Sequence, residues 1–360
     1  MHAAAWAAVM AVASCATVRQ PVRQPVRPSV RQADVVPLPD LPDPHGIAGA
    51  FAGVAQGRLL VGGGANFPDG VMPWDGGRKV WHDAVYALDL ETPSPEWREV
   101  GRLPAPNAYG VSLTTPEGVL VIGGSDADRH FAEVWAMRWE DGRLVRRALP
   151  PLPRPRAQMA GALVGREVHV VGGIEHPQDA TASAAHWMLD LGDVAAGWRA
   201  LPPLPGPGRI LATAAAEGDT LLVFGGCALA PDDSGAPRRT YLEDAWRYAR
   251  GAWTRLADMP RPSAAAPSPA PVRDGSAFVV GGDDGSQAGR RPAEHHGFTR
   301  EILRYDLATD AWHSAGTLDV PTPVTLPTAP WRDGFVFASG EVRPGVRTPA
   351  VFVVRPAAVR

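Results

Sequence analysis

The run "EVHVVGG" (167–173), a short apolar stretch closed by two glycines, is one of six similar runs in the chain. The others are "RLLVGGG" (58–64), "GVLVIGG" (118–124), "TLLVFGG" (220–226), "SAFVVGG" (276–282) and "GFVFASG" (334–340), the last with Ser339 in place of a first glycine. Counted from the first glycine of each run, beginning at Gly62, neighbouring repeats lie 49 to 61 residues apart. Repeats of this period are typical of the blades of a β-propeller.

Two further strands are predicted after each glycine run. One carries an aromatic residue, as in "AVYALDL" (84–90) and "ILRYDL" (302–307). The next opens on tryptophan in "WREVGRLP" (97–104), "WRALPPLP" (198–205), "WTRLADMP" (253–260) and "WHSAGTL" (312–318), whereas the second repeat has "LVRRALPPLP" (144–153). This pattern resembles the kelch motif over about residues 36–355. The resemblance implies an all-β fold, a six-bladed kelch-type β-propeller, with the aromatic side chains packed between blades.

The composition fits such a fold and excludes one class of partner. Of the 360 residues, 45% are hydrophobic and 20% are charged, which is the balance of a soluble globular chain. Glycine (39) and proline (38) are spread evenly, so short strands are favoured over long helices. A net charge of −3 and the lack of a basic block argue against nucleic acid as a partner.

The last repeat lacks an outer strand, and the missing piece stands at the other end of the chain. The sixth repeat ends at "AVFVV" (350–354) with no tryptophan-led strand after it. The stretch "VVPLPDLPDP" (35–44) looks like an outer strand without the rest of its blade. We therefore expect the last blade to be closed by an N-terminal strand, which hides sheet edges that would otherwise be exposed.

The N-terminal residues predict export. Residues 1–15 hold a short apolar run, "AAAWAAVMAVAS", and end in Val-Ala-Ser-Cys15, which resembles a bacterial lipobox with Cys15 as the lipidated residue. Residues 16–34, rich in Pro, Arg and Gln, read as a tether before a propeller at 35–360.

We expect a bacterial periplasmic or outer-envelope protein attached to the membrane through Cys15. With Cys15 lipidated or removed, Cys227 is the sole remaining cysteine and no internal disulfide forms. Recovery of the native protein from the cytosol with residues 1–14 intact would contradict this expectation.

Two sets of loops are expected to share one mouth of the ring. The first two strands of a kelch blade form its inner hairpin, so the loop leading into the first strand and the loop leaving the second lie at the same end. Propellers bind ligands at such an end of the central channel. The polar and aromatic residues that these loops bring together are Glu341, Arg347, Arg156, Arg209, Tyr109 and Asn66.

Three segments extend the resemblance to a particular family. The stretches "GGGANFPDG" (62–70), "NAYGVSL" (107–113) and "GEVRPGVRT" (340–348) resemble the bacterial N-acetylneuraminate epimerases (sialic acid mutarotases), which are six-bladed kelch proteins. The resemblance implies that Glu341 is the proton acceptor and that Arg347 belongs to the same pocket. Here "GEVRPGVRT" closes the chain, whereas the family has it in a middle blade, so the resemblance is to a cyclically permuted subgroup. A closed ring tolerates such relocation of its termini.

The family chemistry suits these residues. Sialic acid is a 2-keto acid closed as a hemiketal, and its mutarotation needs proton transfer at the anomeric hydroxyl and at the ring oxygen. One positioned carboxylate can serve both steps, worth about 10²–10⁴-fold in rate. Arg347, together with Arg156 or Arg209, is expected to bind the sugar carboxylate by bidentate contact. No metal or redox cofactor is required.

Other function classes stay open at this point. A non-catalytic kelch propeller that binds a glycan or a protein partner would need no turnover at Glu341. A galactose-oxidase-like copper enzyme would need a pattern of tyrosine, histidine and cysteine ligands that the chain, with five tyrosines, does not show. The histidines of "AEHHGF" (293–298) read as solvated loop residues rather than metal ligands. The sequence does not specify an oligomeric state.

Overall fold

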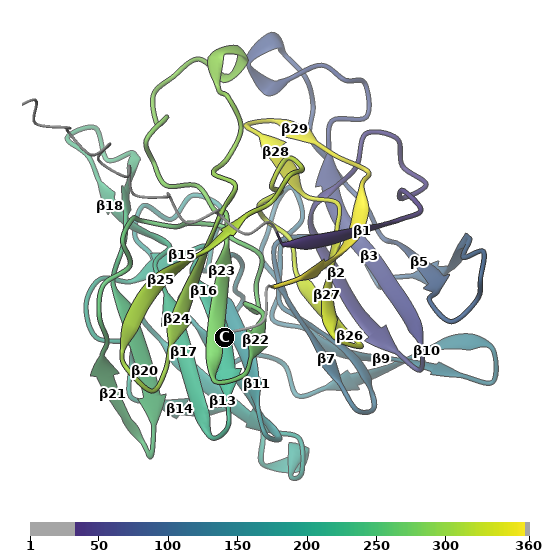
Figure 1. The fold of residues 1–360 in the computed structure, drawn as a ribbon, viewed down its shortest axis with the longest axis horizontal. Helices are drawn as coiled ribbons and strands as arrows, with labels where there is room; N and C mark the ends of the chain where they lie inside the picture. The colour runs from purple at the N-terminus through teal and green to yellow at the C-terminus, as the bar shows by residue number, and fades with distance from the viewer. Residues whose placement is uncertain (1–32, 357–360) are drawn as a thin grey trace, which may run out of the picture. The chain divides into compact units, whose positions relative to one another are not determined.

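The computed structural model describes residues 33–356. The predicted export signal, Cys15 and all of the predicted tether except its last two residues lie outside this range. Within it the chain forms six antiparallel sheets, five of four strands and one of five, which follow one another along the sequence as the blades of a propeller (Figure 1). The described residues hold no α-helix and three short 3-10 turns, η1 (Pro73–Asp75), η2 (Val194–Ala196) and η3 (Pro292–Glu294). The predicted all-β, six-bladed kelch-type fold is confirmed.

Each blade is an antiparallel meander. In the first five blades the strands follow one another along the chain from the innermost to the outermost. Blade 1 holds β2 (Ala48–Ala55), β3 (Arg58–Asn66), β5 (Ala84–Asp89) and β6 (Trp97–Arg102). Blade 2 holds β7 (Val111–Thr115), β8 (Gly118–Ile122), β9 (Val134–Glu140) and β10 (Arg143–Leu149). Blade 3 holds β11 (Ala160–Val164), β12 (Glu167–Val171), β13 (His186–Asp190) and β14 (Arg199–Leu201). Blade 4 holds β16 (Thr213–Glu217), β17 (Thr220–Phe224), β20 (Ala245–Ala249) and β21 (Ala252–Arg255). Blade 5 holds β22 (Val272–Arg273), β23 (Ser276–Val280), β24 (Glu301–Asp306) and β25 (Ala311–Thr317).

The sixth blade joins the two ends of the propeller. Its strands are β26 (Thr328–Trp331), β27 (Gly334–Ala338), β30 (Val351–Arg355) and β1 (Asp34–Leu38). β1 pairs antiparallel with β30 along its whole length, so the last blade is closed by an N-terminal strand, as predicted. β1 begins one residue before the predicted boundary.

Smaller strands decorate one end of the blades. They are β4 (Val80–Trp81), which pairs with β3, the sheet of β15 (Arg209–Ile210), β18 (Cys227–Pro231) and β19 (Pro237–Tyr241), and the hairpin of β28 (Glu341–Arg343) and β29 (Val346–Arg347). Figure 1 shows the β28–β29 hairpin at the top of the view, beside the blue-purple loop of blade 1 and the green loop of blade 5.

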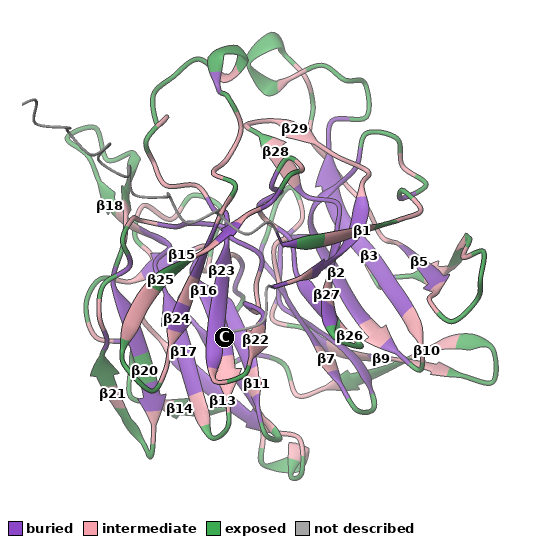
Figure 2. Cartoon of the chain, in the orientation of Figure 1, coloured by how far each residue is buried: buried purple, intermediate pink, exposed green. Residues whose placement is uncertain are grey.

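The core is divided among the blade junctions. Each of six buried apolar clusters takes its members from two neighbouring blades, and Figure 2 shows the inner strands buried and the connecting loops exposed. The tryptophans that open fourth strands lie at these junctions. Trp198 Nε1 donates to the carbonyl of Pro150 at 2.8 Å, and Trp97 Nε1 donates to that of Pro39 at 2.9 Å. Pro39 directly follows β1, as Pro150 directly follows β10. The end of the N-terminal strand therefore accepts the same tryptophan hydrogen bond as the end of an ordinary outer strand.

The glycine pairs are required by the approach of the next blade. Gly123 has a φ of +59°, and a Cβ there would lie 2.5 Å from the carbonyl oxygen of Arg156 in blade 3. In the first repeat Gly63 and Gly64, with positive φ, are the structural pair, so Gly62 is a regular strand residue rather than the first of the pair. Ser339 adopts the same left-handed φ of +66° in the last repeat. Its hydroxyl accepts the N–H of Ile47 at 2.7 Å and lies 2.7 Å from the carbonyl of Thr348, which fastens blade 6 to blade 1.

A buried histidine pair in blade 3 predicts that the stability of the fold depends on pH. His169 Nδ1 and His186 Nε2 lie 2.9 Å apart, and the His186 ring packs edge-on against Tyr248 of blade 4. Burial, and then the neighbouring His169, lower the pKa of His186 to about 3. The neutral ring is therefore favoured in the folded state, and its contribution to stability is complete above about pH 6.5 and lost as the pH falls toward 3.

We expect the free energy of unfolding to fall by on the order of 4 kcal/mol across that window from this group. Urea titrations at a series of pH values measure it. His186→Phe should flatten the slope, while His313→Gln, at an exposed site, should leave it unchanged. An equal slope in His186→Phe and the parent would show that this pair does not govern acid stability.

Candidate active site at the propeller mouth

The residues that follow the glycine pairs occupy equivalent places in the six blades. Glu341 forms an antiparallel bridge with Val324, which leads into the first strand of blade 6. The same bridge recurs in every blade, so the two sets of loops do share one end, as predicted. We call the six residues at these places the mouth positions: Ala65, Ser125, Ile174, Cys227, Asp283 and Glu341. The acidic ones stand in the neighbouring blades 5 and 6, and Asp283 already accepts the hydroxyl of Tyr241 at 2.8 Å.

A ring of backbone hydrogen bonds forms the floor of this mouth. Each mouth position is bridged to a residue that leads into the first strand of its blade. In every blade the residue that follows this bridge partner has a left-handed φ between +56° and +66°. Each donates its N–H to the carbonyl of the corresponding residue in the preceding blade at 2.7–2.9 Å, which closes a circle. The members of this floor ring are Gly49, Tyr109, Gln158, Leu211, Ala265 and Thr325.

The channel at the floor ring is too narrow for a sugar. The cavity that the ring residues line measures about 70 Å³. Ligand pockets are usually about 300 Å³ or more. A monosaccharide would therefore bind above the ring, among the loops of the mouth, rather than within the channel.

The β28–β29 hairpin holds the predicted acid and base together. Glu341 and Arg347 are paired in the hairpin register, and Arg347 Nη2 lies 3.2 Å from Glu341 Oε2. The N–H of Gly345 donates to Glu341 Oε1 at 3.3 Å, and Arg347 Nη1 donates to the Gly345 carbonyl at 2.5 Å. Pro344 and Gly345, with φ of +81° at Gly345, make the turn that brings the two side chains back to each other.

The surroundings of Glu341 suit a proton acceptor. Its side chain is 21% exposed and that of Arg347 only 5%. Burial raises the pKa of the Glu341 carboxyl, and the charges of Arg347 and Lys79 oppose the rise without cancelling it. A carboxylate whose pKa is raised toward the working pH is a stronger base than an ordinary surface glutamate.

Aromatic and cationic groups from blade 1 face this hairpin. The Arg347 guanidinium lies 4.7 Å from the ring centre of Phe67. Tyr109, a predicted site residue, presents its ring to the Lys79 ammonium at 4.4 Å. Sequence reasoning missed Phe67 and Lys79 as site residues. No spacing in "GGRKVW" (76–81) indicates which rings the lysine will meet.

Asn66 is placed differently from the sequence expectation. Its side chain is fully buried, and its Nδ2 donates to Asp43 Oδ2 at 2.7 Å and to the Gly46 carbonyl at 2.9 Å. Its Oδ1 lies 2.8 Å from His82 Nε2. With its polar atoms engaged inside the blade 6–blade 1 junction, Asn66 supports the mouth rather than reaching a ligand in it.

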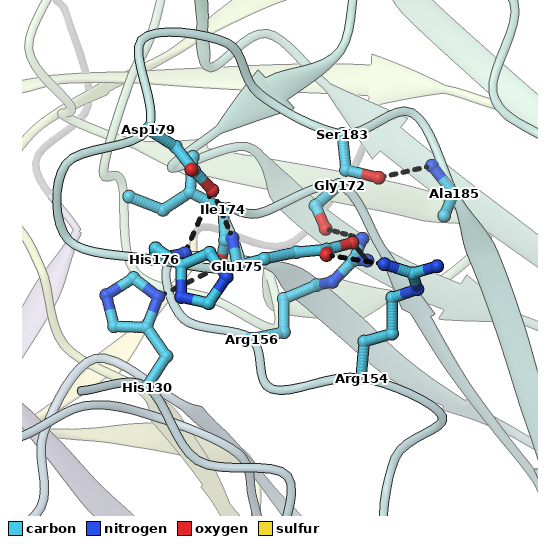
Figure 3. A network of polar contacts seen from close by, with 10 residues as sticks. All are labelled: His130, Arg154, Arg156, Gly172, Ile174, Glu175, His176, Asp179, Ser183 and Ala185. Carbon is cyan, nitrogen blue, oxygen red and sulfur yellow. Dashed lines mark hydrogen bonds and ion pairs between the residues drawn. The ribbon is translucent and has the colours of Figure 1, made fainter.

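Arg156 was also expected to contact substrate, and the structure gives it internal partners. Its side chain is buried, and Figure 3 shows it among Glu175, Gly172 and Arg154. Nη2 donates to Glu175 Oε1 at 2.9 Å and Nη1 to the Gly172 carbonyl at 2.9 Å. The guanidinium also stacks 4.1 Å from the Trp187 ring centre. Both terminal nitrogens of the guanidinium, and the face that contacts the Trp187 ring, are thus engaged within the protein.

Arg209 repeats this arrangement in blade 4. Its side chain is fully buried, forms a bidentate ion pair with Asp244 at 2.6 and 2.8 Å, and donates to the Gly225 carbonyl at 3.0 Å. In blade 2 the amide of Asn107 makes the matching bond to Gly123 at 2.9 Å. In blades 2, 3 and 4, Asn107, Arg156 and Arg209 thus each donate to the carbonyl of the first glycine of the pair. Arg156 and Arg209 fill a structural role, and we leave both out of the site.

Two other sequence features do not join the site. Cys227 is free and buried, and burial raises the pKa of its thiol to about 12, so it is not a reactive thiolate. His295 is buried against Phe298. Residues 33–356 contain no cluster of three His, Cys, Asp or Glu side chains arranged to hold a metal ion. The same range contains no helix of the length and apolarity needed to cross a membrane.

Part of the chain is similar in sequence to a family of known proteins. A family model described as N-acetylneuraminate epimerase matches residues 18–145. The resemblance to the N-acetylneuraminate epimerases is confirmed. The N-acetylneuraminate epimerase of Brucella suis is 38% identical over 122 residues, 31% of this chain and 30% of its own length. That of Yersinia enterocolitica is 38% identical over 109 residues, 28% of this chain and 27% of its own.

These epimerase matches cover part of the molecule. The chain spans about three tenths of the length of the curated relatives it matches. The family match takes in Asn66, Lys79 and Tyr109, and the hairpin with Glu341 lies outside it. A solved structure entitled "Structure of YjhT" aligns over 88% of this chain and 96% of its own, with a TM-score of 0.65 and 17% identity, which establishes a shared fold. The cyclic permutation stays a prediction.

Proposed function

We propose that this protein is a carbohydrate isomerase, a mutarotase that interconverts the anomers of N-acetylneuraminic acid or a closely related acidic sugar. The observation that carries the proposal is the half-buried Glu341–Arg347 pair, which the β28–β29 hairpin holds together at the mouth. The family match and the relatives' names support the same reaction class.

The proposed reaction is a ring opening and reclosure in which the carboxylate of Glu341 moves the protons. Glu341 takes the proton of the anomeric hydroxyl while the bond between the anomeric carbon and the ring oxygen breaks. Glu341 gives this proton to the ring oxygen, which becomes a hydroxyl, and the anomeric carbon becomes the ketone of the open chain. After rotation about the adjacent carbon–carbon bond, the hydroxyl formed from the ring oxygen attacks the other face of the ketone. Its proton returns through Glu341 to the former ketone oxygen, which restores the ring as the other anomer. Bonds and protons balance without a cofactor.

Arg347 has a positioning role in this scheme. Its two terminal nitrogens already contact Glu341 and the Gly345 carbonyl, and its Nε is buried without an acceptor among the described residues. Arg347 therefore fixes the direction of the carboxylate, and its charge opposes the rise in the pKa of Glu341 that burial causes. The expected bidentate contact to substrate would require Arg347 to leave this pair.

NMR of freshly dissolved single anomers tests the proposal. Catalysis predicts that N-acetylneuraminic acid reaches its anomeric equilibrium faster with protein than in buffer alone. A neutral sugar such as galactose, measured alongside, defines the substrate class. An unchanged rate for every sugar, together with binding of one of them, would refute turnover.

A non-catalytic kelch propeller that binds a glycan or a protein is the second candidate. The observation that favours it is Trp74, 48% exposed on the blade 1 loop next to the hairpin turn. Exposed tryptophans stack on sugar rings and anchor protein interfaces. Under this alternative Trp74→Ala abolishes binding, whereas the mutarotase proposal assigns the decisive role to Glu341.

A further inference from the structure

The chain uses lysine once. Of 35 basic residues in 360, Lys79 is the single lysine and all the others are arginine. A composition that favours arginine so strongly makes an isolated lysine informative about its position. Arginine and lysine differ in chemistry, since the guanidinium is a planar fork that stacks, whereas the ammonium is a compact point charge with three donors.

Lys79 lies at the mouth against two rings. Its Nζ is 4.4 Å from the ring centre of Tyr109, a member of the floor ring, and 4.9 Å from that of Trp81 in β4. β4 pairs with the end of β3, where Trp81 faces the mouth position Ala65. The ammonium is thereby fixed between aromatic faces that carry negative charge density. The contact with Tyr109 places the Lys79 ammonium next to the floor ring.

The ammonium has no carboxylate of its own. Among residues 33–356, no Asp or Glu oxygen lies within ion-pair distance of Lys79 Nζ, whereas Arg347, Arg209 and Arg156 are each paired. The buried Nε1 of Trp81 likewise donates to no group in the described range. That indole N–H has no accessible surface, so the fixed, unpaired ammonium is the group that an incoming anion would meet.

We propose that Lys79 determines substrate specificity by binding the carboxylate of the acidic sugar. The inference rests on the proposed function. Glu341 transfers the protons while Arg347 holds its carboxylate in place, and Lys79 makes the site prefer a negatively charged sugar. It replaces Arg156, Arg209 and Arg347 as the substrate's cationic partner, since all three are already engaged.

The single lysine permits a direct test of contact. Reductive methylation of the folded protein, followed by peptide mapping, reports on Lys79 as the single lysine of the chain. Saturating N-acetylneuraminic acid should slow labelling of Lys79 at least fivefold in the folded protein and leave it unchanged in the protein unfolded in urea. Its methyl ester, which lacks the charge, should protect much less. Equal labelling with and without the acid would overturn the proposal.

Variants provide the second measurement. Lys79→Met should weaken equilibrium binding of N-acetylneuraminic acid at least tenfold, with binding of the methyl ester little changed. Lys79→Arg should restore only part of the loss, because the guanidinium does not fit the place of the ammonium. Arg78→Met, which removes the neighbouring exposed charge, is the matched control and should bind like the parent. If Lys79→Met binds the acid as the parent does, or loses acid and ester equally, Lys79 does not select the charge.

These results are independent of turnover. Should the parent protein fail to speed anomer exchange while N-acetylneuraminic acid still protects Lys79, the mutarotase proposal falls and the anion site stands. Should Lys79→Met exchange anomers with the KM and kcat of the parent, the anion site at Lys79 falls and the mutarotase proposal stands. Circular dichroism and melting curves confirm that each variant is folded, which is expected because Lys79 lies on a half-exposed loop.

Discussion

Replacing Glu341 with glutamine should reduce catalysed anomer exchange about a hundredfold or more, with sugar binding nearly unchanged. The amide keeps the size of the carboxylate and its contact with the Gly345 N–H, but it does not accept a proton at the working pH. NMR exchange rates at saturating sugar measure the chemical step, and equilibrium titration measures binding. Binding retained without exchange would identify Glu341 as the base.

The pH dependence sharpens this expectation. Because burial raises the pKa of Glu341, the acid limb of the rate profile should lie above the usual glutamate value of about 4.3. Activity should be lost as the pH falls through the raised pKa. Lys79→Met removes a positive charge that opposes the rise, so it should move the limb further up.

Glu294→Gln is the matched control for this substitution. Glu294 is an exposed carboxylate on the blade 5 loop, paired only with Arg291 three residues away. Its replacement should leave both exchange and binding within twofold of the parent. If Glu341→Gln exchanges anomers as fast as the parent, the carboxylate is not the base and the binding-only alternative gains support.

The fold was predictable because the repeats carry their own geometry. The left-handed residue of each glycine pair and the tryptophan that bonds to the preceding blade are local requirements that leave a visible trace in sequence. Even the exception at Ser339 fits, since its hydroxyl makes the junction bonds that hold a left-handed non-glycine residue in place. The missing outer strand pointed to β1 because a sheet edge has to be covered.

The site was predictable only in part. Glu341 and Arg347 share one short hairpin, so their pairing follows from seven residues of sequence. Arg156 and Arg209 do reach the expected end of the ring, but their partners Glu175 and Asp244 lie 19 and 35 residues farther along the chain. No local pattern reveals that such long-range carboxylates neutralise an arginine. Only the three-dimensional structure separates these engaged cations from the unpaired one at Lys79.

Deleting residues 34–44, with Ala33 joined to His45, should cost on the order of 5 kcal/mol of folding free energy or prevent soluble folding. β1 forms five register pairs with β30, and Val36, Leu38 and Leu41 contribute to the apolar cluster between blades 6 and 1. Fully burying one such side chain contributes about 1.5–3 kcal/mol. The deletion also frees the edge of β30 for pairing with another chain, so aggregation is expected on heating.

The same deletion should disturb the candidate site, because the segment after β1 supports the mouth. The N–H of Leu41 donates to the Pro349 carbonyl at 2.9 Å, just beyond the hairpin, and Asp43 accepts from Asn66 at 2.7 Å. Thermal melts and anomer exchange should therefore both fall. Deleting residues 1–32 instead, which leaves β1 intact, is the control and should alter neither. A synthetic peptide of residues 33–45 should restore part of the melting temperature, since a propeller opened at one strand can accept that strand in trans. A deletion variant that melts within 2 °C of the parent would show that β1 is not what closes the ring.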